Sequence, residues 1–391
     1  MYGAMFKRNV AWCAAARVAE EGCAVKELRC AFVGCGGAGL AYLDAYRSLP
    51  GVQIAACIDI DLERAQCAAR SFARYNAAGE RQPVRVSADF ADALTSDVDL
   101  LVVSTPNHLH RDQAIAALKH DKHVFLQKPL ASTLEDAVAI LQATRESKAH
   151  AGVYMSYFDH PIIHDFREMV LRGWFGEVTQ MHGSLMHSGG LLWTKEIAAG
   201  KPASWRGSVR LTGGGAFIQL AVHYIRMMCW IIGKRVQSIM GFASNRMCPG
   251  IEGEDTAVAI LELEGGMVAT LNVSWCGEGE EFSIHGTQGS LTHLNNQYTR
   301  LQSEHSYEGD AICYVAPGLQ HIENLPVDRS DANQPYNQHR IFLEEIRSGK
   351  PAFVSIETAV QDMMVVDAFY ESVRTGKKVL IAPSSASVCT A

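Results

Sequence analysis

Short apolar runs and helical stretches alternate along the first 150 residues of the chain. The runs typical of buried strands are 28–33, 52–58, 84–86, 100–104 and 123–126, and the helical stretches between them are 40–48, 62–75 and 111–120. Strands that alternate with helices at this spacing are typical of βαβ units with a parallel sheet. The pattern therefore predicts a doubly wound Rossmann domain over residues 27–150.

The pattern changes after residue 151. Several segments there alternate apolar and polar residues with a period of two, as strands with one buried face do. These segments are 178–184, 236–243, 257–264, 267–275 and 281–286. We expect a second, substrate-binding and oligomerisation α/β domain over residues 151–380, followed by a tail at 381–391.

Length, composition and charge narrow the function. A chain of 391 residues exceeds what one hydrophobic core supports, and a hydrophobic fraction of 48% is typical of globular proteins. A formal net charge of -7 without a long basic run argues against nucleic acid or an anionic membrane as a partner. We therefore expect a small neutral molecule as the partner.

The cysteines and the N-terminus indicate the compartment. The eleven cysteines form no C-x-x-C pair and no Cys/His cluster with metal-ligand spacing, so we interpret them as reduced thiols of a cytoplasmic protein without a metal site. No apolar run approaches the roughly 18 residues that span a bilayer, the closest being 227–233 with its flanks. Charged residues interrupt the apolar stretch near the start, so residues 1–26 are interpreted as an N-terminal extension rather than a signal peptide.

A glycine-rich turn follows the first predicted strand and precedes the first predicted helix. Gly34, Gly36 and Gly39 supply the G-x-G-x-x-G pattern, and Cys35, Gly37 and Ala38 lie between them. The first glycine permits a tight turn, the second lets the backbone approach a pyrophosphate, and the third allows close packing of the helix. Free N–H groups at the start of the helix favour an anion, so this turn is predicted to bind a dinucleotide.

An acidic residue ends the second predicted strand. Asp59 follows Gly39 at the distance of about 20 residues that is expected for the carboxylate that binds the adenine ribose. This carboxylate would accept hydrogen bonds from the ribose hydroxyls and repel a 2′-phosphate, which favours NAD over NADP. Ile60 stands where an NADP enzyme would carry a polar or basic residue, although Arg64 could reach a 2′-phosphate.

A polar segment follows the fourth predicted strand, at the sheet edge where open α/β sheets bind ligands. Thr105 and Asn107 offer short polar groups to the ribose or to the nicotinamide amide, and the remaining predicted cofactor residues of this segment are Ser104, Pro106 and His110. The alternative is a capped turn between a strand and a helix, and for His108 and His110 that alternative is equally favoured.

Gln127 and Lys128 follow the fifth predicted strand at the same edge, directly before Pro129. A lysine between a buried strand and a proline is badly placed for a merely solvated charge. Its ammonium can hydrogen-bond a substrate oxygen and stabilise the charge that develops as hydride moves. Lys128 is therefore predicted to be catalytic, and both residues are predicted to contact the cofactor.

With these motifs, the chain resembles the glucose–fructose oxidoreductase / inositol dehydrogenase / rhizopine catabolism family, Gfo/Idh/MocA. The resemblance covers about residues 27–378 and rests on the segments 34–39, 105–110, 117–124 and 127–129, and on Gly-Gly-Gly at 213–215 with His223. It implies a C-terminal α/β domain with a large, mostly antiparallel sheet, and the strand pattern after residue 151 agrees. It also implies a homo-oligomer, a dimer or tetramer, that pairs through this sheet.

The glycine-rich segment 213–215 leads into a predicted helix that carries Gln219, His223 and Arg226. Spacings of four and three residues place these side chains on one helical face, which we expect to meet the cleft. The resemblance implies that His223 acts in catalysis, and Gln219 is predicted to orient it or to bind a substrate hydroxyl.

This chain departs from the family at three positions. The family usually has an aspartate in place of Gln219, a glutamate in place of Gln127, and an aspartate where Arg226 stands. An amide raises the basicity of a histidine much less than a carboxylate does, so the acid–base work must be divided differently. Arg226 could favour an anionic substrate or pair with a carboxylate elsewhere.

Four further residues are predicted to bind substrate because they follow the Rossmann domain or lie near the cleft. They are Tyr157, Asp159, Trp205 and Arg206. Aromatic rings beside hydrogen-bonding groups suit the apolar faces and hydroxyl rim of a sugar, although each of these residues could equally belong to the core.

The predicted activity is reversible, NAD-dependent oxidation of a secondary alcohol on a sugar, glycoside or cyclitol, with Lys128 and His223 holding and deprotonating the hydroxyl. Two alternatives stay open. A redox-neutral enzyme with tightly bound NAD would oxidise a sugar transiently, for epimerisation, elimination or glycoside cleavage. A non-catalytic NAD-binding sensor would change its NAD affinity with a ligand and show no turnover.

Overall fold

The computed structural model describes residues 27–37, 39, 46, 49–72, 83–201, 204–295, 310–316, 319–325 and 337–382. The predicted N-terminal extension, Ala38, most of the predicted helix at 40–48, and residues 383–391 of the predicted tail lie outside this part of the chain.

The first half forms a parallel sheet of six strands in the order β3-β2-β1-β4-β5-β6, which confirms the predicted doubly wound architecture. The strands are β1 (Leu28–Val33), β2 (Val52–Ile58), β3 (Arg85–Ser87), β4 (Leu100–Val103), β5 (His123–Gln127) and β6 (Ala151–Tyr154). The elements that connect them are α3 (Leu62–Ser71), η2 (Phe90–Ala93), α4 (Asn107–Lys119) and α5 (Leu134–Glu146). Asp61 and Thr133 cap α3 and α5 by accepting hydrogen bonds from backbone N–H groups of the first turn.

The register of this sheet brings the predicted cofactor segments to one edge. Val33 at the end of β1 pairs with Ile58 of β2 on one side and with Val103 of β4 on the other. Val103 in turn pairs with Leu126 of β5. The residues that follow these strands therefore lie side by side at the carboxyl edge, where ligands bind in open α/β sheets.

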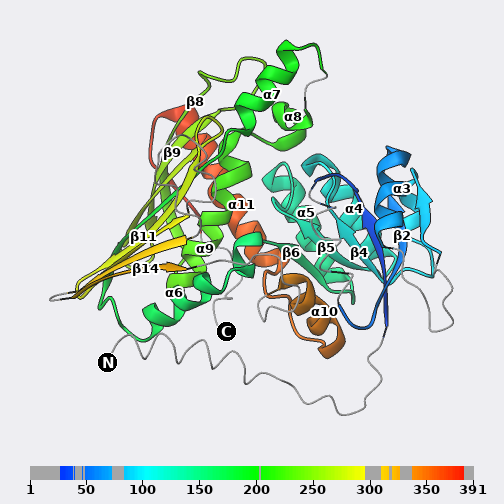
Figure 1. Cartoon of the computed structure of the whole chain (residues 1–391), viewed down its shortest axis with the longest axis horizontal. Helices are drawn as coiled ribbons and strands as arrows, with labels where there is room; N and C mark the ends of the chain where they lie inside the picture. The colour runs from blue at the N-terminus through cyan, green and yellow to red at the C-terminus, as the bar shows by residue number, and fades with distance from the viewer. Residues whose placement is uncertain are drawn as a thin grey trace.

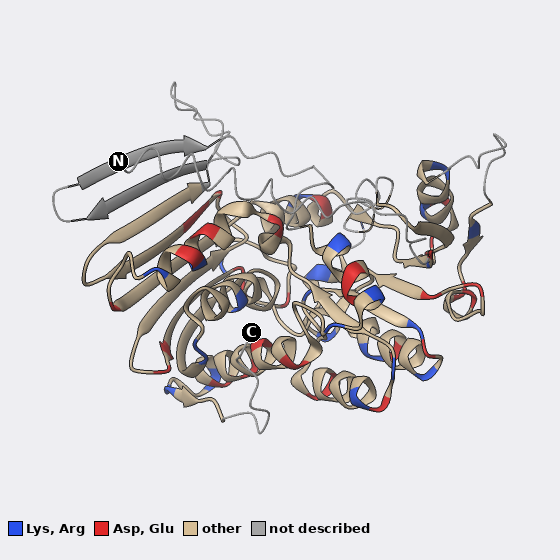
Figure 2. Cartoon of the chain, turned by 90° about the horizontal axis from the view of Figure 1, so that it is seen from below, with Lys and Arg blue, Asp and Glu red and all other residues tan. Residues whose placement is uncertain are grey.

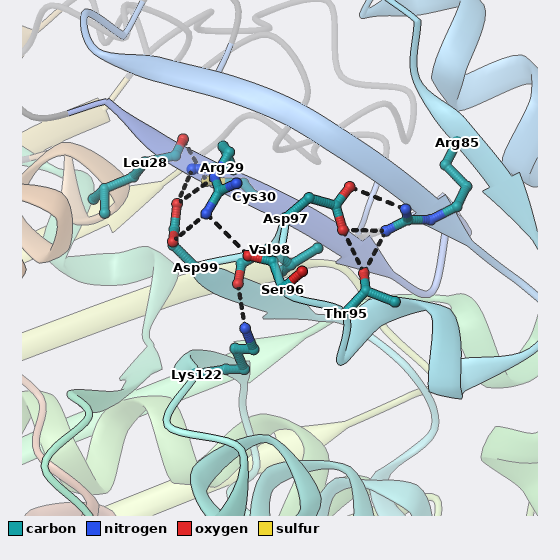
Figure 3. A network of polar contacts seen from close by, with 10 residues as sticks. All are labelled: Leu28, Arg29, Cys30, Arg85, Thr95, Ser96, Asp97, Val98, Asp99 and Lys122. Carbon is teal, nitrogen blue, oxygen red and sulfur yellow. Dashed lines mark hydrogen bonds and ion pairs between the residues drawn. The ribbon is translucent and has the colours of Figure 1, made fainter.

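The opposite edge of the sheet is held by ion pairs (Figure 3). Arg29 of β1 donates from Nε and a terminal nitrogen to the carboxylate of Asp99, and Arg85 of β3 pairs with Asp97 at 3.0 Å. Lys122 adds a hydrogen bond of 2.7 Å from Nζ to the carbonyl oxygen of Val98. These contacts join β1, β3 and β4 to the loops before β4 and β5 without entering the cofactor edge.

The second half forms a nine-stranded sheet in the order β14-β13-β12-β11-β7-β10-β9-β8-β15, in which only β7 and β10 pair in parallel. Its strands are β7 (Val178–Met186), β8 (Val236–Ser244), β9 (Thr256–Leu263), β10 (Val268–Ser274), β11 (Gly279–Gly286), β12 (Ser290–Asn295), β13 (Asp310–Ala316), β14 (Leu319–Leu325) and β15 (Val379–Leu380). This large, mostly antiparallel sheet confirms the second element of the predicted fold class.

Helices and helical turns of the second half lie between and around the two sheets (Figure 1). They are η3 (Ser156–Asp159), α6 (Pro161–Leu171), α7 (Gly189–Ala198), η4 (Trp205–Gly207), α8 (Val209–Thr212), η5 (Phe217–Ala221), α9 (Val222–Ile232), α10 (Gln338–Ser348) and α11 (Ile356–Thr375). Helix α11 contacts β8 of the second sheet, β6 of the first, and also α5 and α9, so one core is continuous between the halves. A second core under the first sheet includes Phe342 and Leu343 of α10.

The stretch Val209–Ile232 has the length and apolar composition of a membrane span, with a mean hydropathy of 1.4. This was not predicted from the sequence, which has no continuous apolar run of that length. The most apolar part of this stretch is 89% buried inside the protein, so η5 and α9 belong to the core of the second half. Charged residues of both signs are interspersed along the helices in Figure 2, as is typical of a solvated surface.

Candidate active site

The glycine turn has the shape of a phosphate cradle. Gly34 has a φ of +87°, and a Cβ on it would lie 2.8 Å from the backbone of Ser104. A Cβ on Gly39 would lie 2.2 Å from the carbonyl oxygen of Gly34, so the outer glycines allow the strand and helix to pack closely. Gly36 and Gly37 have open space where their side chains would be. The turn therefore fits a dinucleotide pyrophosphate.

Asp59 closes the next strand and faces this turn. Its carboxylate accepts hydrogen bonds from the backbone N–H groups of Cys35, at 2.7 Å, and Asp61, at 2.9 Å. Ile60 is 92% exposed. Arg64 pairs with Asp61 at 3.1 Å, so its guanidinium is already engaged by a carboxylate. This arrangement offers an adenine ribose an acid rather than a free cation.

The segment after β4 uses several of its polar groups internally. Ser104 Oγ donates to the carbonyl oxygen of Gly34 at 2.7 Å, and Thr105 Oγ1 donates to Gln113 Oε1 at 2.6 Å. Pro106 occupies the N-cap position of α4. Asn107 donates from Nδ2 to the carbonyl oxygen of Thr212 at 2.9 Å, and so joins the first sheet to the second half.

His110, a predicted cofactor residue, has its imidazole turned into the protein. It is fully buried, and both ring nitrogens face backbone carbonyl oxygens, Nδ1 that of Pro129 at 3.0 Å and Nε2 that of Thr105 at 3.0 Å. The ring therefore links the two loops that carry Thr105 and Lys128. The position of His110 in the sequence motif does not indicate whether the side chain links these loops or contacts the cofactor.

Lys128 lies in a cavity of about 290 Å³ between the two halves. Its Nζ donates a hydrogen bond of 2.7 Å to the carbonyl oxygen of Gln219, and Gln127 Oε1 accepts one of 2.8 Å from the Lys128 backbone N–H. Burial, with the nearby Arg206 guanidinium, lowers the pKa of Lys128 to about 7. The lysine can therefore gain or lose a proton near neutral pH.

A π-helical turn, η5, exposes the carbonyl that Lys128 uses. In such a turn the backbone hydrogen bonds run from i to i+5, which loosens the regular helix and is frequent at functional sites. Gln219 on this turn lines the Lys128 cavity and is 7% exposed. Its Nε2 has no hydrogen-bond partner among the described residues. A buried amide donor of this kind is costly unless a ligand accepts its hydrogen bond.

His223 opens into a neighbouring cavity of about 250 Å³, and Leu220 lines both cavities. The imidazole packs on Tyr157 with ring centroids 5.0 Å apart, and its Nδ1 is buried without a hydrogen-bond partner in the described part of the chain. Burial first, and the Lys128 charge second, hold the pKa of His223 well below its usual value. His223 is therefore a neutral hydrogen-bonding group.

Tyr157 and Asp159, two of the predicted substrate residues, line the His223 cavity. Tyr157 donates its hydroxyl to Glu280 Oε1 at 2.9 Å. The carboxylate of Asp159 accepts from the Tyr154 hydroxyl at 2.7 Å and from the Gln338 backbone N–H at 2.9 Å. Asp159 thus holds the cavity wall with oxygens that are already hydrogen-bonded.

Trp205 and Arg206 line the Lys128 cavity from η4. The guanidinium of Arg206 lies over the Trp205 ring, 4.5 Å from its centroid. Its charge is one of the causes that lower the pKa of Lys128. These two residues therefore place a cation and an aromatic face opposite the lysine.

Several residues of the two cavities were not singled out from the sequence. Trp193 and Trp275 line the Lys128 cavity, and Glu280 lines the His223 cavity. They come from helix α7, from the turn after β10 and from strand β11, whose positions depend on the pairing of the second sheet. The only sequence signal was the density of aromatic and histidine residues near 187–193.

Arg226 does not face the cleft, contrary to our expectation. It is buried and pairs with Asp362 of α11, with Nε and Oδ1 3.5 Å apart. The two residues line another cavity, of about 640 Å³, which shares no lining residue with the Lys128 and His223 cavities. The helix has packed neighbours on both sides, so the spacing of polar residues alone did not identify the side that meets the cleft.

Comparisons with known proteins agree with this geometry. A family model described as "Oxidoreductase family, NAD-binding Rossmann fold" matches residues 28–155, and one described as "Oxidoreductase family, C-terminal alpha/beta domain" matches residues 167–381. Levoglucosan dehydrogenase of Pseudarthrobacter phenanthrenivorans is 24% identical over 312 residues, which cover 71% of this chain and 78% of that protein. D-apiose dehydrogenase of Paraburkholderia graminis is 24% identical over 365 residues, which cover 91% of this chain and 90% of that protein.

A solved structure of a levoglucosan dehydrogenase in complex with NADH has the same fold. It superposes with a TM-score of 0.78 at 19% identity, and the match covers 91% of this chain and 100% of that chain. The two family models together match most of the sequence, one on each half. The protein therefore belongs to the Gfo/Idh/MocA oxidoreductase family, with the NAD-binding Rossmann domain of that family followed by its C-terminal α/β domain.

Proposed function

We propose that this protein is an NAD-dependent sugar dehydrogenase that oxidises a secondary alcohol, with Lys128 as the acid–base residue. The observation that carries the proposal is the position of Lys128. It lies at the carboxyl edge of the Rossmann sheet, its Nζ is fixed by the Gln219 carbonyl, and it lines one cavity with Thr105 and Asn107. The names of the relatives, which include levoglucosan and D-apiose dehydrogenases, support a sugar as the substrate class.

The preference for NAD rests on Asp59. Its carboxylate lies beside the glycine turn, where the adenine ribose of a dinucleotide binds. A 2′-phosphate there would meet this negative charge, and the nearest candidate cation, Arg64, is paired with Asp61. When bound, the nicotinamide supplies the acceptor for the hydride.

Lys128 performs the proton transfer in this mechanism. The lowered pKa leaves a substantial fraction of the amine neutral at neutral pH, so Nζ can take the proton of the substrate hydroxyl as the carbon loses hydride. The Gln219 carbonyl accepts a hydrogen bond from the amine and from the ammonium that forms, which keeps Nζ in one position. In the reverse direction the ammonium returns the proton.

His223 and Gln219 position the substrate. The neutral imidazole can exchange a hydrogen bond with a sugar hydroxyl without placing a second charge beside the protonated lysine. The unpartnered Gln219 Nε2 can donate to a substrate oxygen or to the carboxamide of the nicotinamide. Trp205 and Tyr157 supply apolar faces for the sugar ring, one in each cavity.

A substrate panel tests this function. Sugars, glycosides and inositols are incubated with NAD or NADP, and NADH formation is followed at the nicotinamide absorbance band in single-turnover and steady-state assays. Net NADH formation with one sugar class supports the proposal. Product formation without net NADH would replace it with a redox-neutral reaction, and NAD binding that depends on a sugar without turnover would replace it with a sensor.

We also propose that copies of the chain pair through the outer face of the second sheet. Phe242 and Met240 of β8 are 74% and 48% exposed, and their cross-strand partners on β9, Val258 and Ile260, are 44% and 52% exposed. Contiguous exposed apolar side chains on one sheet face are typical of a protein–protein interface.

The seven cysteines whose side chains the structure describes are free thiols. This supports our inference that the protein works in a reducing compartment such as the cytoplasm.

A further inference from the structure

Two cysteines far apart in the sequence are in contact behind the wall of the Lys128 cavity. Cys248 lies in the loop between β8 and β9, Cys276 follows β10, and their Sγ atoms are 3.5 Å apart. A disulfide bond has an S–S distance of about 2.05 Å, so a small rotation of the side chains would suffice to close one. We propose that Cys248 and Cys276 form an oxidisable dithiol that closes to a disulfide on reaction with a peroxide and so alters the substrate cavity.

The loop that carries Cys248 is held in a defined shape. Asp255 Oδ2 accepts hydrogen bonds from the backbone N–H groups of Arg246, Met247 and Cys248. Asn245 Nδ2 donates to two carbonyl oxygens of the same loop, those of Ile251 and Gly253. The Cys248 backbone is therefore fixed, and the contact with Cys276 is part of a built site.

The difference in burial between the two thiols determines which one reacts first with the peroxide. Cys276 is half-buried, whereas Cys248 is fully buried. A peroxide, ROOH, would oxidise the Cys276 thiol to a sulfenic acid and leave as the alcohol ROH, as the O–O bond breaks and an S–O bond forms. The Cys248 sulfur would then attack the Cys276 sulfur, and the oxygen would leave with the thiol proton as water. Two thiols lose two electrons and two protons, and the peroxide is reduced.

The reaction should be slow at neutral pH. Burial, and then the hydrogen bond with Cys248, raise the pKa of the Cys276 thiol to about 12, so the reactive thiolate is scarce. We therefore expect the disulfide to form more slowly than in a fast peroxide sensor. The experiment needs a long incubation with the oxidant.

The same side chains do not favour a metal ion. Cys248, Cys276 and Asp255 place their ligand atoms within 4.8 Å of one another, and no fourth histidine, cysteine, aspartate or glutamate joins them in the described part of the chain. One oxygen of Asp255 already accepts three backbone hydrogen bonds. A structural zinc site needs four ligands, so a dithiol is the better assignment.

A disulfide here would reach the substrate cavity through two tryptophans. Trp275 precedes Cys276 and lines the Lys128 cavity together with Trp193 of α7, and their rings meet edge to face at 5.1 Å. Gly190 of α7 packs so closely that a Cβ on it would lie 2.7 Å from Trp275 Cβ and 2.8 Å from Cys248 Sγ. The Cys248 sulfur and Trp275 therefore both pack against α7, so a change at the dithiol can reach the cavity through this helix.

The test oxidises the full chain with hydrogen peroxide and follows the product by intact mass and peptide mapping. We expect a species lighter by two hydrogens, with the peptides of Cys248 and Cys276 cross-linked, and reversal by dithiothreitol. Cys276→Ser and Cys248→Ser should each abolish this cross-link, and Cys276→Ser serves if the buried Cys248→Ser fails to fold. Cys67→Ser, which removes an exposed thiol of α3, is the matched control and should leave the cross-link intact.

A second measurement tests whether oxidation alters substrate binding in the Lys128 cavity. Oxidation should change the KM of a confirmed substrate by roughly fivefold, the lower end of couplings between sites, in the wild type and not in Cys276→Ser. Three results would overturn the proposal: an unchanged mass after exhaustive oxidation, a cross-link only between other cysteines such as the neighbouring Cys35 and Cys57, or stoichiometric zinc that protects both thiols. A cross-link that leaves KM unchanged would refute its effect on the cavity.

Discussion

Lys128 and Gln219 come from opposite halves of the chain and meet in a hydrogen bond of 2.7 Å between Nζ and a backbone carbonyl oxygen. The carbonyl lies on the π-helical turn η5, and the register of the Rossmann sheet places Lys128 at its carboxyl edge. In the proposed mechanism the backbone thus fixes the acid–base group, and the Gln219 side chain is left to bind a ligand. This explains how the site can work with an amide where the family usually has an aspartate.

The first prediction concerns the Lys128 amine. Lys128→Ala should lower kcat for sugar oxidation by about 10²–10⁴-fold, because a positioned acid–base group contributes that much to a proton transfer. Steady-state kinetics on a confirmed substrate measure the effect. Lys122→Ala is the matched control, because Lys122 Nζ also donates to a backbone carbonyl oxygen at 2.7 Å, but at the opposite edge of the sheet. Equal turnover of wild type and Lys128→Ala would contradict the assignment.

The second prediction is the pH dependence of the same step. Burial lowers the pKa of Lys128 to about 7, and the neutral amine exists above that pKa, so kcat/KM for oxidation should rise with pH and level off above about 7. For reduction the ammonium is the active form, and kcat/KM should fall over the same range. Arg206→Met removes a cause of the lowered pKa and should move both limbs to higher pH. If the pH profiles of kcat/KM do not shift in this variant, the titrating group is not Lys128.

The third prediction concerns the cofactor. Asp59→Ser should weaken NAD binding about tenfold or more, because a hydrogen bond to a charged group contributes about 1.5–3 kcal/mol. NADP binding should weaken less or improve, since the charge that repels the 2′-phosphate is gone. Fluorescence titration with both cofactors gives the two dissociation constants. Asp89→Ser, which removes the cap of η2 after β3, is the control and should leave the NAD preference unchanged. An unchanged preference in Asp59→Ser would remove Asp59 from the site.

The fourth prediction tests the role that the structure gives Arg226. Its ion pair with Asp362 is buried, with side-chain exposures of 10% and 2%. Burial raises the pKa of Asp362 to about 7 even beside the Arg226 cation. Arg226→Met should lower the free energy of unfolding by about 3 kcal/mol, because it leaves the buried Asp362 carboxyl group without its ion-pair partner. The double variant Arg226→Met/Asp362→Leu should recover much of this loss. Urea unfolding measures both variants, and KM for the sugar should stay at the wild-type value. A large increase in KM with unchanged stability would return Arg226 to the cleft.

The Rossmann half could be predicted from the sequence because its signals are local. Its strands are short apolar runs, the glycine turn has fixed spacing, and Asp59 follows at a set distance. The predicted strand at 100–104 corresponds to β4 at Leu100–Val103, and the predicted helix at 62–75 to α3 at Leu62–Ser71. Because parallel strands end at one edge, the position of Lys128 near the cofactor segments followed from the pattern.

The second half could be predicted only as a fold class. Trp275 and Glu280 reach the cavities through strand pairing between distant segments, which no local spacing encodes. The spacing of Gln219, His223 and Arg226 predicted one polar face, but Arg226 on helix α9 pairs with Asp362 of α11, and this packing is not encoded in the local spacing. His110 shows a further limit of sequence motifs. A motif position indicates where a side chain lies, but not whether its nitrogens already form hydrogen bonds within the protein.

The last prediction concerns the apolar outer face of the second sheet. Phe242 lies on this face and is 74% exposed. A carboxylate at this position would be buried without a partner in any interface that covers β8 and β9, which is costly. Phe242→Asp should therefore reduce the mass of the wild-type assembly to that of the monomer, as measured by light scattering after size-exclusion chromatography. Leu171→Asp is the matched control, because Leu171 on α6 is 66% exposed outside this face, and it should leave the assembly intact. A wild-type chain that is monomeric at micromolar concentration, or a Phe242→Asp assembly of unchanged mass, would show that this face does not join copies of the chain.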